Sequence, residues 1–360
     1  MRILHVSSAK SWRGGEQQIA YLVDALNKKG VQQTLACCED GELRKRMINR
    51  CTLIPYKKTS ALNLRFALRL KRYAKDADIV HVHDSHAHTA AYIAALLGCK
   101  TPVVVHRRVD FPIGKNALSY QKYNHHSIVR IICVSDLIKT VVQKTLKQPS
   151  KAVTVYSGVD VDRFDKRSNA LHALLGLPTD AKLIGNTSAL ADHKDYPTFL
   201  RTAANVLKTH QKVHFVIFGD GEERDAILQQ ANELGISEVV HLVGFRNDLR
   251  RLLPCLDIFL MPSKTEGLGT SILDAFAAKV PVVATNAGGI PEIVRHKKTG
   301  LTSAVGNDFE LAQHVTNILE NTTQTQELIA GAIEHLEGFT VDAMSSNILS
   351  VYRNIAEKPA

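Results

Sequence analysis

Long apolar runs are missing from this sequence: none approaches the roughly 20 residues that a helix needs to span a bilayer, so no membrane-spanning protein is expected. CxxC pairs are missing too, and the six cysteines are scattered, which is typical of reduced thiols in a cytosol. The start lacks an apolar export signal, and no low-complexity tract or short repeat occurs. We therefore expect a globular, cytoplasmic protein that is neither secreted nor a solenoid.

The length of 360 residues is too great for one small core, and two domains are the default expectation. Residues 1–165 hold 27 Lys and Arg against 13 Asp and Glu, a net charge of +14, whereas residues 166–360 carry −4. A basic half joined to a slightly acidic half indicates that the first half faces an anionic partner. Composition does not distinguish a nucleic acid, a lipid surface or a phosphorylated molecule.

Short apolar segments alternate with amphipathic ones along both halves. RILHVS (2–7) runs into Gly14–Gly15 and an amphipathic stretch, and ADIVHVH, PVVVH and RIICVS follow; the alternation restarts near residue 182. This pattern predicts an α/β fold with two doubly wound parallel sheets, whose ligands bind beyond the carboxyl ends of the strands. The segment YSGVDVDRFD (156–165) is the natural hinge, and the last residues form one more amphipathic helix.

The most informative stretch is 262–295, PSKTEGLGTSILDAFAAKVPVVATNAGGIPEIVR. Glu266 precedes two glycines at a strand-to-helix junction, and Asp274 follows in the helix. Backbone N–H groups at such a junction suit a diphosphate, and a carboxylate there can accept hydrogen bonds from sugar hydroxyls. For any single motif of this kind the alternative is a plain turn that needs glycine for its geometry.

Glu266 with an acidic residue eight positions on, followed by PVVATNAGGIPEIV, resembles the donor-site signature of retaining GT-B glycosyltransferases of family 4. Five features match in order elsewhere: the Gly-Gly turn, DIVHVH, a strand ending in His106, YSGVD and FGDG. Together they cover nearly the whole chain. The resemblance implies a GT-B fold, with two Rossmann-like domains facing a central cleft, and a protein of the lipopolysaccharide or envelope-glycan type.

The resemblance also implies roles for individual residues. His106 and Glu266 would hold the transferred sugar, and Lys194 would stabilise the leaving nucleoside diphosphate. Phe245 and Arg246 would meet the base, and Asp274 the ribose. The donor-binding positions would be Gly15, Phe245, Arg246, Leu268, Gly269, Thr270 and Asp274. Residues 1–165 would bind the acceptor and residues 166–339 the donor, and the helix within 340–360 would return to the first domain.

Two positions depart from the family pattern. Ser188 stands where the family usually has an arginine six residues before the active-site lysine, so one cation expected on the diphosphate is missing. His193, Arg246 or an arginine of the first domain such as Arg13 are candidates to replace it. Asp274 stands for the usual glutamate, which keeps the charge and shortens the reach by one methylene.

Histidines 81, 83, 86 and 88 raise the question of a metal, because alternate residues of a strand face the same side. No cysteine or glutamate set completes a tetrahedron, and an HxH pair is part of the family pattern. We expect no metal and no cofactor, with Lys194 and helix N-termini in place of a cation.

Basic residues suggest two further surfaces. Segment 62–75, with Arg65, Arg69 and Arg72, is either a solvated helix packed on its sheet or an attachment to an anionic membrane face. Arg107 and Arg108 directly follow His106, and we assign them to an acceptor-side loop suited to acidic or phosphorylated glycans.

These observations lead to the hypothesis of a cytoplasmic, retaining, metal-independent hexosyltransferase, peripheral on the inner membrane. It would move a sugar from a nucleoside diphosphate donor, most simply a UDP-sugar, to a hydroxyl of a lipid-linked or lipopolysaccharide-type saccharide. One alternative is a UDP-sugar 2-epimerase on the same fold, for which we see no acid–base pair beyond histidines. The other is a non-enzymatic binder of anionic polymers; no nucleic-acid-reading motif supports a nucleic-acid partner.

Overall fold

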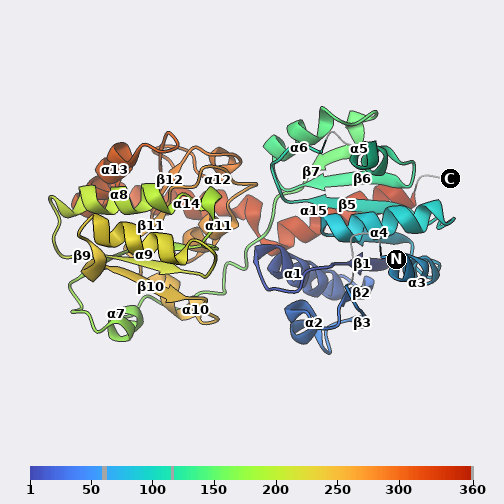
Figure 1. The fold of residues 1–360 in the computed structure, drawn as a ribbon, viewed down its shortest axis with the longest axis horizontal. Coiled ribbons are helices and arrows are strands. Elements are labelled where there is room, and N and C mark those ends of the chain that lie inside the picture. The colour runs from blue at the N-terminus through green and yellow to red at the C-terminus, as the bar shows by residue number, and fades with distance from the viewer. Residues whose placement is uncertain (59–62, 115–116, 358–360) are drawn as a thin grey trace. The chain divides into compact units, whose positions relative to one another are not determined.

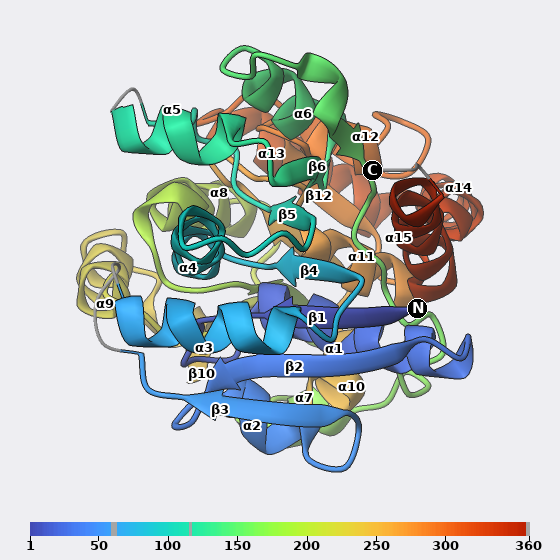
Figure 2. The same cartoon turned by 90° about the vertical axis from the view of Figure 1, so that its right-hand side faces the viewer.

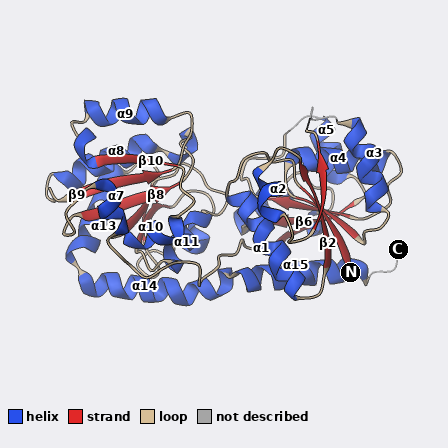
Figure 3. Ribbon diagram, turned by 90° about the horizontal axis from the view of Figure 1, so that it is seen from below, coloured by secondary structure: helices blue, strands red, loops and turns tan. Residues whose placement is uncertain are grey.

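The computed structural model describes residues 1–58, 63–114 and 117–357. The chain divides into two compact units: unit 1 comprises Met1–Gly158 and Val341–Ala360, and unit 2 comprises Val159–Thr340. In each unit a parallel sheet lies between layers of helices (Figure 3). The two doubly wound sheets predicted from the sequence are therefore confirmed. Among the described residues, no helix has both the length and the apolar character that crossing a membrane requires.

Unit 1 is built on a seven-stranded sheet, seen with its strands stacked in Figure 2. In spatial order the strands are β3 (Thr52–Tyr56), β2 (Gln32–Cys38), β1 (Arg2–Val6), β4 (Ile79–Val82), β5 (Val103–Arg107), β6 (Ile128–Cys133) and β7 (Ala152–Thr154). The direction of winding reverses between the neighbours β1 and β4. Loops that leave the carboxyl ends of such a pair diverge, and this switch point is where ligands bind in open α/β sheets.

Seven helices connect or cover these strands within the described part of unit 1. They are α1 (Gly14–Lys28), α2 (Glu42–Met47), α3 (Leu64–Ala74), α4 (Ser85–Leu96), α5 (Ala117–Asn124), α6 (Asp136–Gln143) and α15 (Val341–Ala356). Figure 1 shows α15, at the red end of the chain, beside this sheet. Met344, Ile348 and Tyr352 recur at helical spacing on α15 and are buried against Ile3 and Leu22. The last helix is therefore part of the unit 1 core.

The edge strand β3 was not predicted from the alternation of apolar residues. Pro55 interrupts its apolar pattern and provides no N–H group for a ladder. In the structure β3 pairs on one side only, with Pro55 opposite Cys37 of β2. An edge position is where a sheet tolerates proline. Leu62, which the sequence included in the following helix, lies outside the described residues.

Unit 2 has a six-stranded parallel sheet with the same winding. In spatial order its strands are β10 (Val240–Gly244), β9 (Val213–Phe218), β8 (Lys182–Thr187), β11 (Ile258–Met261), β12 (Val282–Thr285) and β13 (Leu301–Ser303). Its helices are α7 (Ala170–Leu175), α8 (Tyr196–Leu207), α9 (Arg224–Glu233), α10 (Leu249–Leu252), α11 (Thr270–Ala277), α12 (Ile290–Ile293), α13 (Asp308–Glu320) and α14 (Thr322–Leu336). The switch point lies between β8 and β11.

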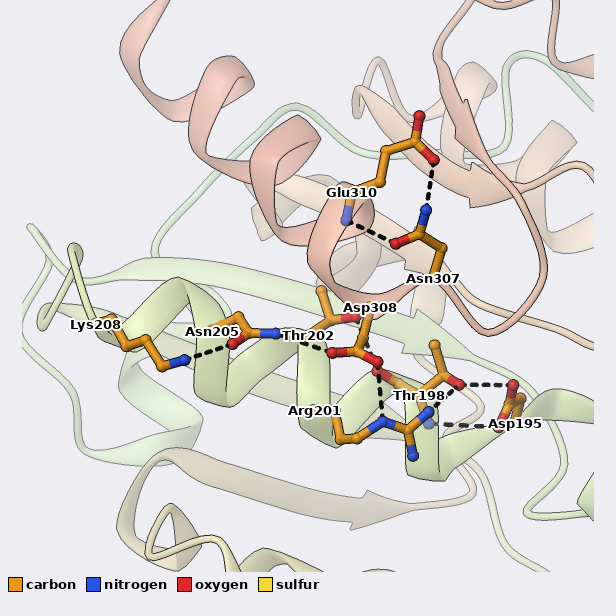
Figure 4. A network of polar contacts seen from close by, with 9 residues as sticks. All are labelled: Asp195, Thr198, Arg201, Thr202, Asn205, Lys208, Asn307, Asp308 and Glu310. Atoms are coloured by element: carbon orange, nitrogen blue, oxygen red, sulfur yellow. Dashed lines mark hydrogen bonds and ion pairs between the residues drawn. The ribbon is translucent and has the colours of Figure 1, made fainter.

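A polar network fixes the start of α8 (Figure 4). Asp195, which adopts φ = 53°, caps the helix through its bonds to the Thr198 backbone N–H and hydroxyl. Arg201 donates to the Thr198 hydroxyl and to Asp308 on α13, and Asn205 donates to the other oxygen of Asp308. The residue directly before this cap is Lys194, so the network holds the backbone on which that side chain is carried.

Candidate active site

Lys194 and Glu266 meet at the switch point of unit 2. Lys194 ends a single 3₁₀ turn (Asp192–Lys194) that follows β8, and Glu266 lies in the loop that follows β11. The Lys194 ammonium donates to Glu266 Oε1 at 2.5 Å, and the side chains are only 15% and 10% exposed. Ser263 donates to the same carboxylate oxygen at 2.9 Å. An ion pair so far withdrawn from water provides a cation and an anion that a polar ligand can engage.

Two glycines of the AGGIPEI segment hold the Glu266 loop by close backbone contact. A Cβ atom on Gly288 would lie 2.1 Å from the Glu266 carbonyl oxygen, and one on Gly289 would lie 2.4 Å from that of Gly267. The Gly289 N–H also donates to the Glu266 carbonyl at 2.8 Å. These glycines are therefore required by packing, and their role is to set the position of Glu266.

The FGDG segment supports the loop that leads to Lys194 in the same way. A Cβ atom on Gly219 would lie 1.8 Å from the Ser188 carbonyl oxygen, and one on Gly221 would lie 2.3 Å from that of Leu190. The Ser188 hydroxyl lies 2.7 Å from the hydroxyl of the buried Tyr196. Ser188 thus serves the internal packing of this loop and offers no positive charge.

The start of α11 presents backbone donors beside Glu266. Gly269 caps the helix with φ = 87°, a left-handed conformation that favours glycine, and Leu268 is buried. Among the described residues, the N–H groups of Leu268, Gly269 and Thr270 donate to no protein acceptor. Free amides at a helix N-terminus attract anions because the helix dipole adds to their partial charges.

Asp274 lies in α11 with its carboxylate 3.6 Å from Arg163. Burial raises the pKa of Asp274 to about 6, and Arg163 partly opposes this rise. Arg163 belongs to the expected hinge segment 156–165, and no sequence motif pairs it with Asp274. The structure therefore adds a cation beside the carboxylate expected to bind the ribose.

Phe245 and Arg246 follow the carboxyl end of β10, at the far edge of the same sheet. The Phe245 side chain is 55% exposed. Arg246 donates through two nitrogens to Asp248, at 2.8 and 2.7 Å. An exposed ring can stack on a base, whereas Arg246 is already neutralised by its neighbour and is a poor replacement for the missing arginine at position 188.

The switch point of unit 1 carries Gly15 and Arg108. Gly15 lies in the first turn of α1, and a Cβ atom there would meet only Arg108 Cδ, at 3.8 Å. Arg108, just after β5, donates to the His83 carbonyl oxygen at 3.1 Å and contacts His83 Nδ1 at 3.3 Å. Arg107 points elsewhere: it donates to the Tyr123 hydroxyl at 3.1 Å and to the Phe111 carbonyl.

Four buried histidines surround this position. His81 stacks on His106 with a centroid distance of 5.3 Å and an interplanar angle of 7°, and it lies 4.1 Å from His83. His5 of β1 joins them, because the β1–β4 register places it opposite His81. The hydroxyl of Tyr352, on α15, lies 2.5 Å from His81 Nδ1. Burial lowers the pKa of His5 to about 4 and those of the other three well below the usual value.

The histidines singled out in the sequence separate in the structure. His86 is exposed, and His88 is buried against Tyr123. Among the described residues, His5, His81 and His83 each offer one ring nitrogen, and these three nitrogens lie within 4.8 Å of one another. The sequence drew attention to the HxH pair and missed His5, which lies 76 positions before His81 in the chain.

Comparison with known families accounts for nearly the whole chain. Residues 12–163 match the model "Glycosyltransferase Family 4", and residues 168–335 match the model "Glycosyl transferases group 1". The chain belongs to the family 4 glycosyltransferases. This family transfers sugars from nucleotide-sugar donors, and the two sheets form its GT-B fold.

Relatives of this glycosyltransferase are distant. The lipopolysaccharide core biosynthesis glycosyltransferase LpsE of Rhizobium meliloti is 26% identical over 368 residues, which span 100% of both chains. N-acetyl-alpha-D-glucosaminyl L-malate synthase of Bacillus anthracis is 26% identical over 289 residues, 78% of this chain and 76% of that protein. The crystal structure of Anabaena Alr3699/HepE in complex with UDP and glucose superposes with a TM-score of 0.86 at 20% identity, covering 98% and 99% of the two chains.

Proposed function

We propose that this glycosyltransferase is a retaining enzyme that moves a hexose from a UDP-sugar to a hydroxyl of a lipid-linked or envelope saccharide of the lipopolysaccharide type. The observation that carries the proposal is the Lys194–Glu266 pair at the switch point of unit 2, beside the free amides of α11. Structures of HepE with UDP and with UDP-glucose support a uridine donor.

Lys194 and the N-terminus of α11 stabilise the leaving diphosphate. Negative charge grows on the diphosphate as its bond to the sugar breaks, and preorganised donors lower the energy of that state more than that of the bound substrate. The Lys194 ammonium and the N–H groups of Leu268, Gly269 and Thr270 provide such donors. We therefore propose that the reaction needs no divalent metal and proceeds in a chelating buffer.

Glu266 and His106 orient the transferred sugar. The Glu266 carboxylate accepts hydrogen bonds from sugar hydroxyls, and its bond from Ser263 keeps it in place. His106 is neutral because burial and the Arg108 charge lower its pKa, so its ring can donate one hydrogen bond and accept another. A phosphate oxygen of the donor takes the proton of the acceptor hydroxyl as the new bond forms on the same face, which gives retention.

Four further residues bind the rest of the donor. Asp274 accepts hydrogen bonds from the ribose. Phe245 stacks on the uracil, and Arg246 contacts the same base. Gly15 allows its backbone to approach the diphosphate, since nothing in the fold itself requires glycine there. These assignments follow the family resemblance; Phe245 and Arg246 directly follow the carboxyl end of β10, and Asp274 lies in α11, the helix after β11.

The acceptor side is proposed from charge and exposure. On α3, Leu64 and Leu68 are 54% and 51% exposed, and each is directly followed by an exposed arginine, Arg65 or Arg69. Exposed leucines flanked by cations suit the interface of an anionic membrane, at about 1 kcal/mol per basic residue near its surface. We assign Arg107 and Arg108 to contacts with an acidic or phosphorylated acceptor. The names of LpsE and of the related LpsD support a lipopolysaccharide-type saccharide.

A panel of radiolabelled UDP-sugars, incubated with a membrane lipid extract in EDTA, tests this function. We expect transfer of one sugar to a glycolipid, and the anomeric configuration of the product, read by NMR, should match that of the donor. A parallel reaction without acceptor detects an epimerase, because a new UDP-sugar would then form. No transfer from any donor, together with no binding of UDP by the folded protein, would contradict the proposal.

A further inference from the structure

The most constrained polar arrangement of unit 1 is a chain of hydrogen bonds that ends at Arg108. Arg108 Nη2 contacts His83 Nδ1 at 3.3 Å, and His83 Nε2 lies 3.0 Å from His5 Nδ1. A guanidinium only donates, so His83 Nδ1 must be the acceptor. The proton of the neutral His83 ring therefore sits on Nε2 and is donated to His5.

The Gln33 end of this series of hydrogen bonds leads independently to the same proton positions. His5 Nε2 lies 3.0 Å from Gln33 Oε1, and Gln33 Nε2 donates to the Val23 carbonyl at 2.8 Å and to Asn27 Oδ1 at 2.7 Å. The Val23 carbonyl only accepts, which fixes the orientation of the Gln33 amide. His5 must then donate from Nε2 and accept at Nδ1. Both ends agree, and every proton in the series Arg108–His83–His5–Gln33 has one possible place.

This arrangement disfavours a metal at His5, His81 and His83, although their nitrogens lie close together. His83 Nε2 carries a proton and has no lone pair to offer, and the Arg108 cation stands next to the ring. The hydrogen-bond series instead holds a guanidinium in one orientation, with Nη1 on the His83 carbonyl.

Arg108 is held without an ion pair. No described carboxylate lies within ion-pairing distance of it, and no side chain outside the described residues is acidic. Its Nε is buried and has no partner among the described residues. Glu16 and Asp84 are near enough to favour its charge, yet burial dominates and lowers the pKa of Arg108 to about 10. A partly desolvated cation in this condition gains from binding an anion.

The Arg108 side chain lies against the start of α1. Arg108 Cδ is the atom nearest to the place of a Gly15 Cβ, at 3.8 Å. Among the described residues, the N–H groups of Gly14 and Gly15 donate to no protein acceptor. α1 has 15 residues, so its dipole and its free amides act on the space that Arg108 adjoins.

We propose that Arg108 is a further phosphate-binding residue of unit 1, beside the Gly14–Gly15 turn that the family resemblance already assigns to the diphosphate, and that His83, His5 and Gln33 are positioning residues for the guanidinium. The inference rests on the proposed function, since a glycosyltransferase of this kind meets phosphate in its donor and in a phosphorylated acceptor. The site takes the phosphate group of one of these two substrates.

Calorimetric titration of the full chain with two probes tests the site. UDP reports the donor phosphate, and glycerol 3-phosphate, added in the presence of saturating UDP, reports a second phosphate. We expect Arg108→Gln to weaken the binding of one probe about tenfold or more. Arg130→Gln is the matched control, because Arg130 lies on β6 of the same unit and donates to the carbonyl of its neighbour Val129. It should bind both probes as the wild type does.

Weaker UDP binding by Arg108→Gln identifies the donor as the source of the phosphate, and weaker glycerol 3-phosphate binding identifies the acceptor. Unchanged affinity for UDP and for glycerol 3-phosphate in Arg108→Gln, alongside a wild type that binds UDP, overturns the site. If Arg108→Gln does not fold, Arg108→Lys keeps the charge and loses the forked geometry, and the same titrations apply. Failure of the proposed function reads differently: the wild type itself would then bind no UDP and transfer no sugar.

Two substitutions of His83 test whether this residue positions Arg108 or only packs against it. His83→Leu removes both hydrogen bonds of the ring, whereas His83→Gln can accept from Arg108 and donate to His5. We expect His83→Leu to lose affinity for the probe that depends on Arg108 and His83→Gln to restore most of it. Equal affinities in the two variants would remove the positioning role.

Discussion

The strands of the two units are wound in the same order, but different interactions hold the polar groups at their switch points. In unit 1 the pair β1–β4 carries buried neutral histidines that hold an arginine. In unit 2 the pair β8–β11 carries an ion pair, Lys194–Glu266, set in loops that glycines pack backbone to backbone. Topology thus places the site in both units, whereas the polar groups there are held differently: by neutral rings in unit 1 and by paired charges in unit 2.

The largest consequence of this difference is sensitivity to acid. Below about pH 6.5 the unfolded chain binds protons at His5, His81, His83 and His106, whereas the fold, with the pKa of His5 at about 4, does not. Each such histidine lowers the free energy of unfolding by about 1.4 kcal/mol per pH unit as the pH falls. Between pH 7 and pH 5 we expect unit 1 to lose about 5 kcal/mol or more.

Hydrogen exchange followed by mass spectrometry can measure this loss for each unit. After correction for intrinsic exchange, peptides from β1 and β4 should lose protection at pH 5, and peptides from β8 and β11 should keep theirs. The histidines of unit 2 with lowered pKa values, such as His214 and His241, are only partly buried, so their contribution is smaller. Earlier opening of unit 2 would reverse the comparison.

Lys194→Ala tests whether sugar transfer depends on the Lys194 charge at the switch point of unit 2. Loss of one preorganised donor to a developing anion costs about 3–4 kcal/mol elsewhere, so turnover should fall by about 10²–10³-fold while the protein stays folded. Lys264→Ala is the matched control: Lys264 lies in the loop after β11 that also carries Glu266, and it pairs with the exposed Asp192. Its turnover should stay near that of the wild type. Equal effects of the two substitutions would mean that general charge, and not the position of Lys194, matters.

How much of this could be predicted differs between the units. The sequence places Lys194 and Glu266 after strands, and a doubly wound fold brings such loops to one edge, so their encounter follows from the pattern. His5 and Tyr352 gave no comparable signal. His5 reaches His81 only through the β1–β4 register, and Tyr352 arrives from a helix more than 250 residues away. Register and long-range docking depend on packing of the whole core, which no local motif contains.

Arg107 and Arg108 show the same limit at a single turn. The sequence treats them as one basic pair, but consecutive side chains after a strand point to opposite sides. Arg107 goes to Tyr123 and Arg108 to His83. Likewise, nothing local pairs Arg163 with Asp274, whereas the glycines of the AGGIPEI segment were visible as a motif, and the structure adds the reason for them.

Gly289→Ala asks whether glycine packing in unit 2 is as necessary as the contacts indicate. Gly289 has φ = −82°, so alanine meets no backbone strain, and the added Cβ would clash with the Gly267 carbonyl and crowd Leu268 Cα at 3.1 Å. We expect a loss of about 2 kcal/mol in the free energy of unfolding, with lower turnover, because Glu266 must shift. Gly338→Ala is the control, since its Cβ would meet nothing within 4 Å. Similar stabilities in denaturant would show that the loop gives way freely.

The smallest expected effect concerns Asp274 of unit 2. It makes the free energy of unfolding depend on pH in the direction opposite to that of the buried histidines of unit 1. Its pKa is raised to about 6, so the fold binds a proton that the unfolded chain, with a pKa near 3.8, has released. The free energy of unfolding therefore falls as the pH rises from about 4 to 6, whereas the buried histidines lower it as the pH falls.

A shift of this size in the pKa of Asp274 corresponds to about 3 kcal/mol, but the side chain keeps 29% of its surface exposed and water screens it. Asp274→Asn should thus stabilise the protein by about 1 kcal/mol at pH 8 and by nothing at pH 4, measured by urea unfolding. A constant difference across this range would show that Asp274 is ionised in the fold and fully paired with Arg163.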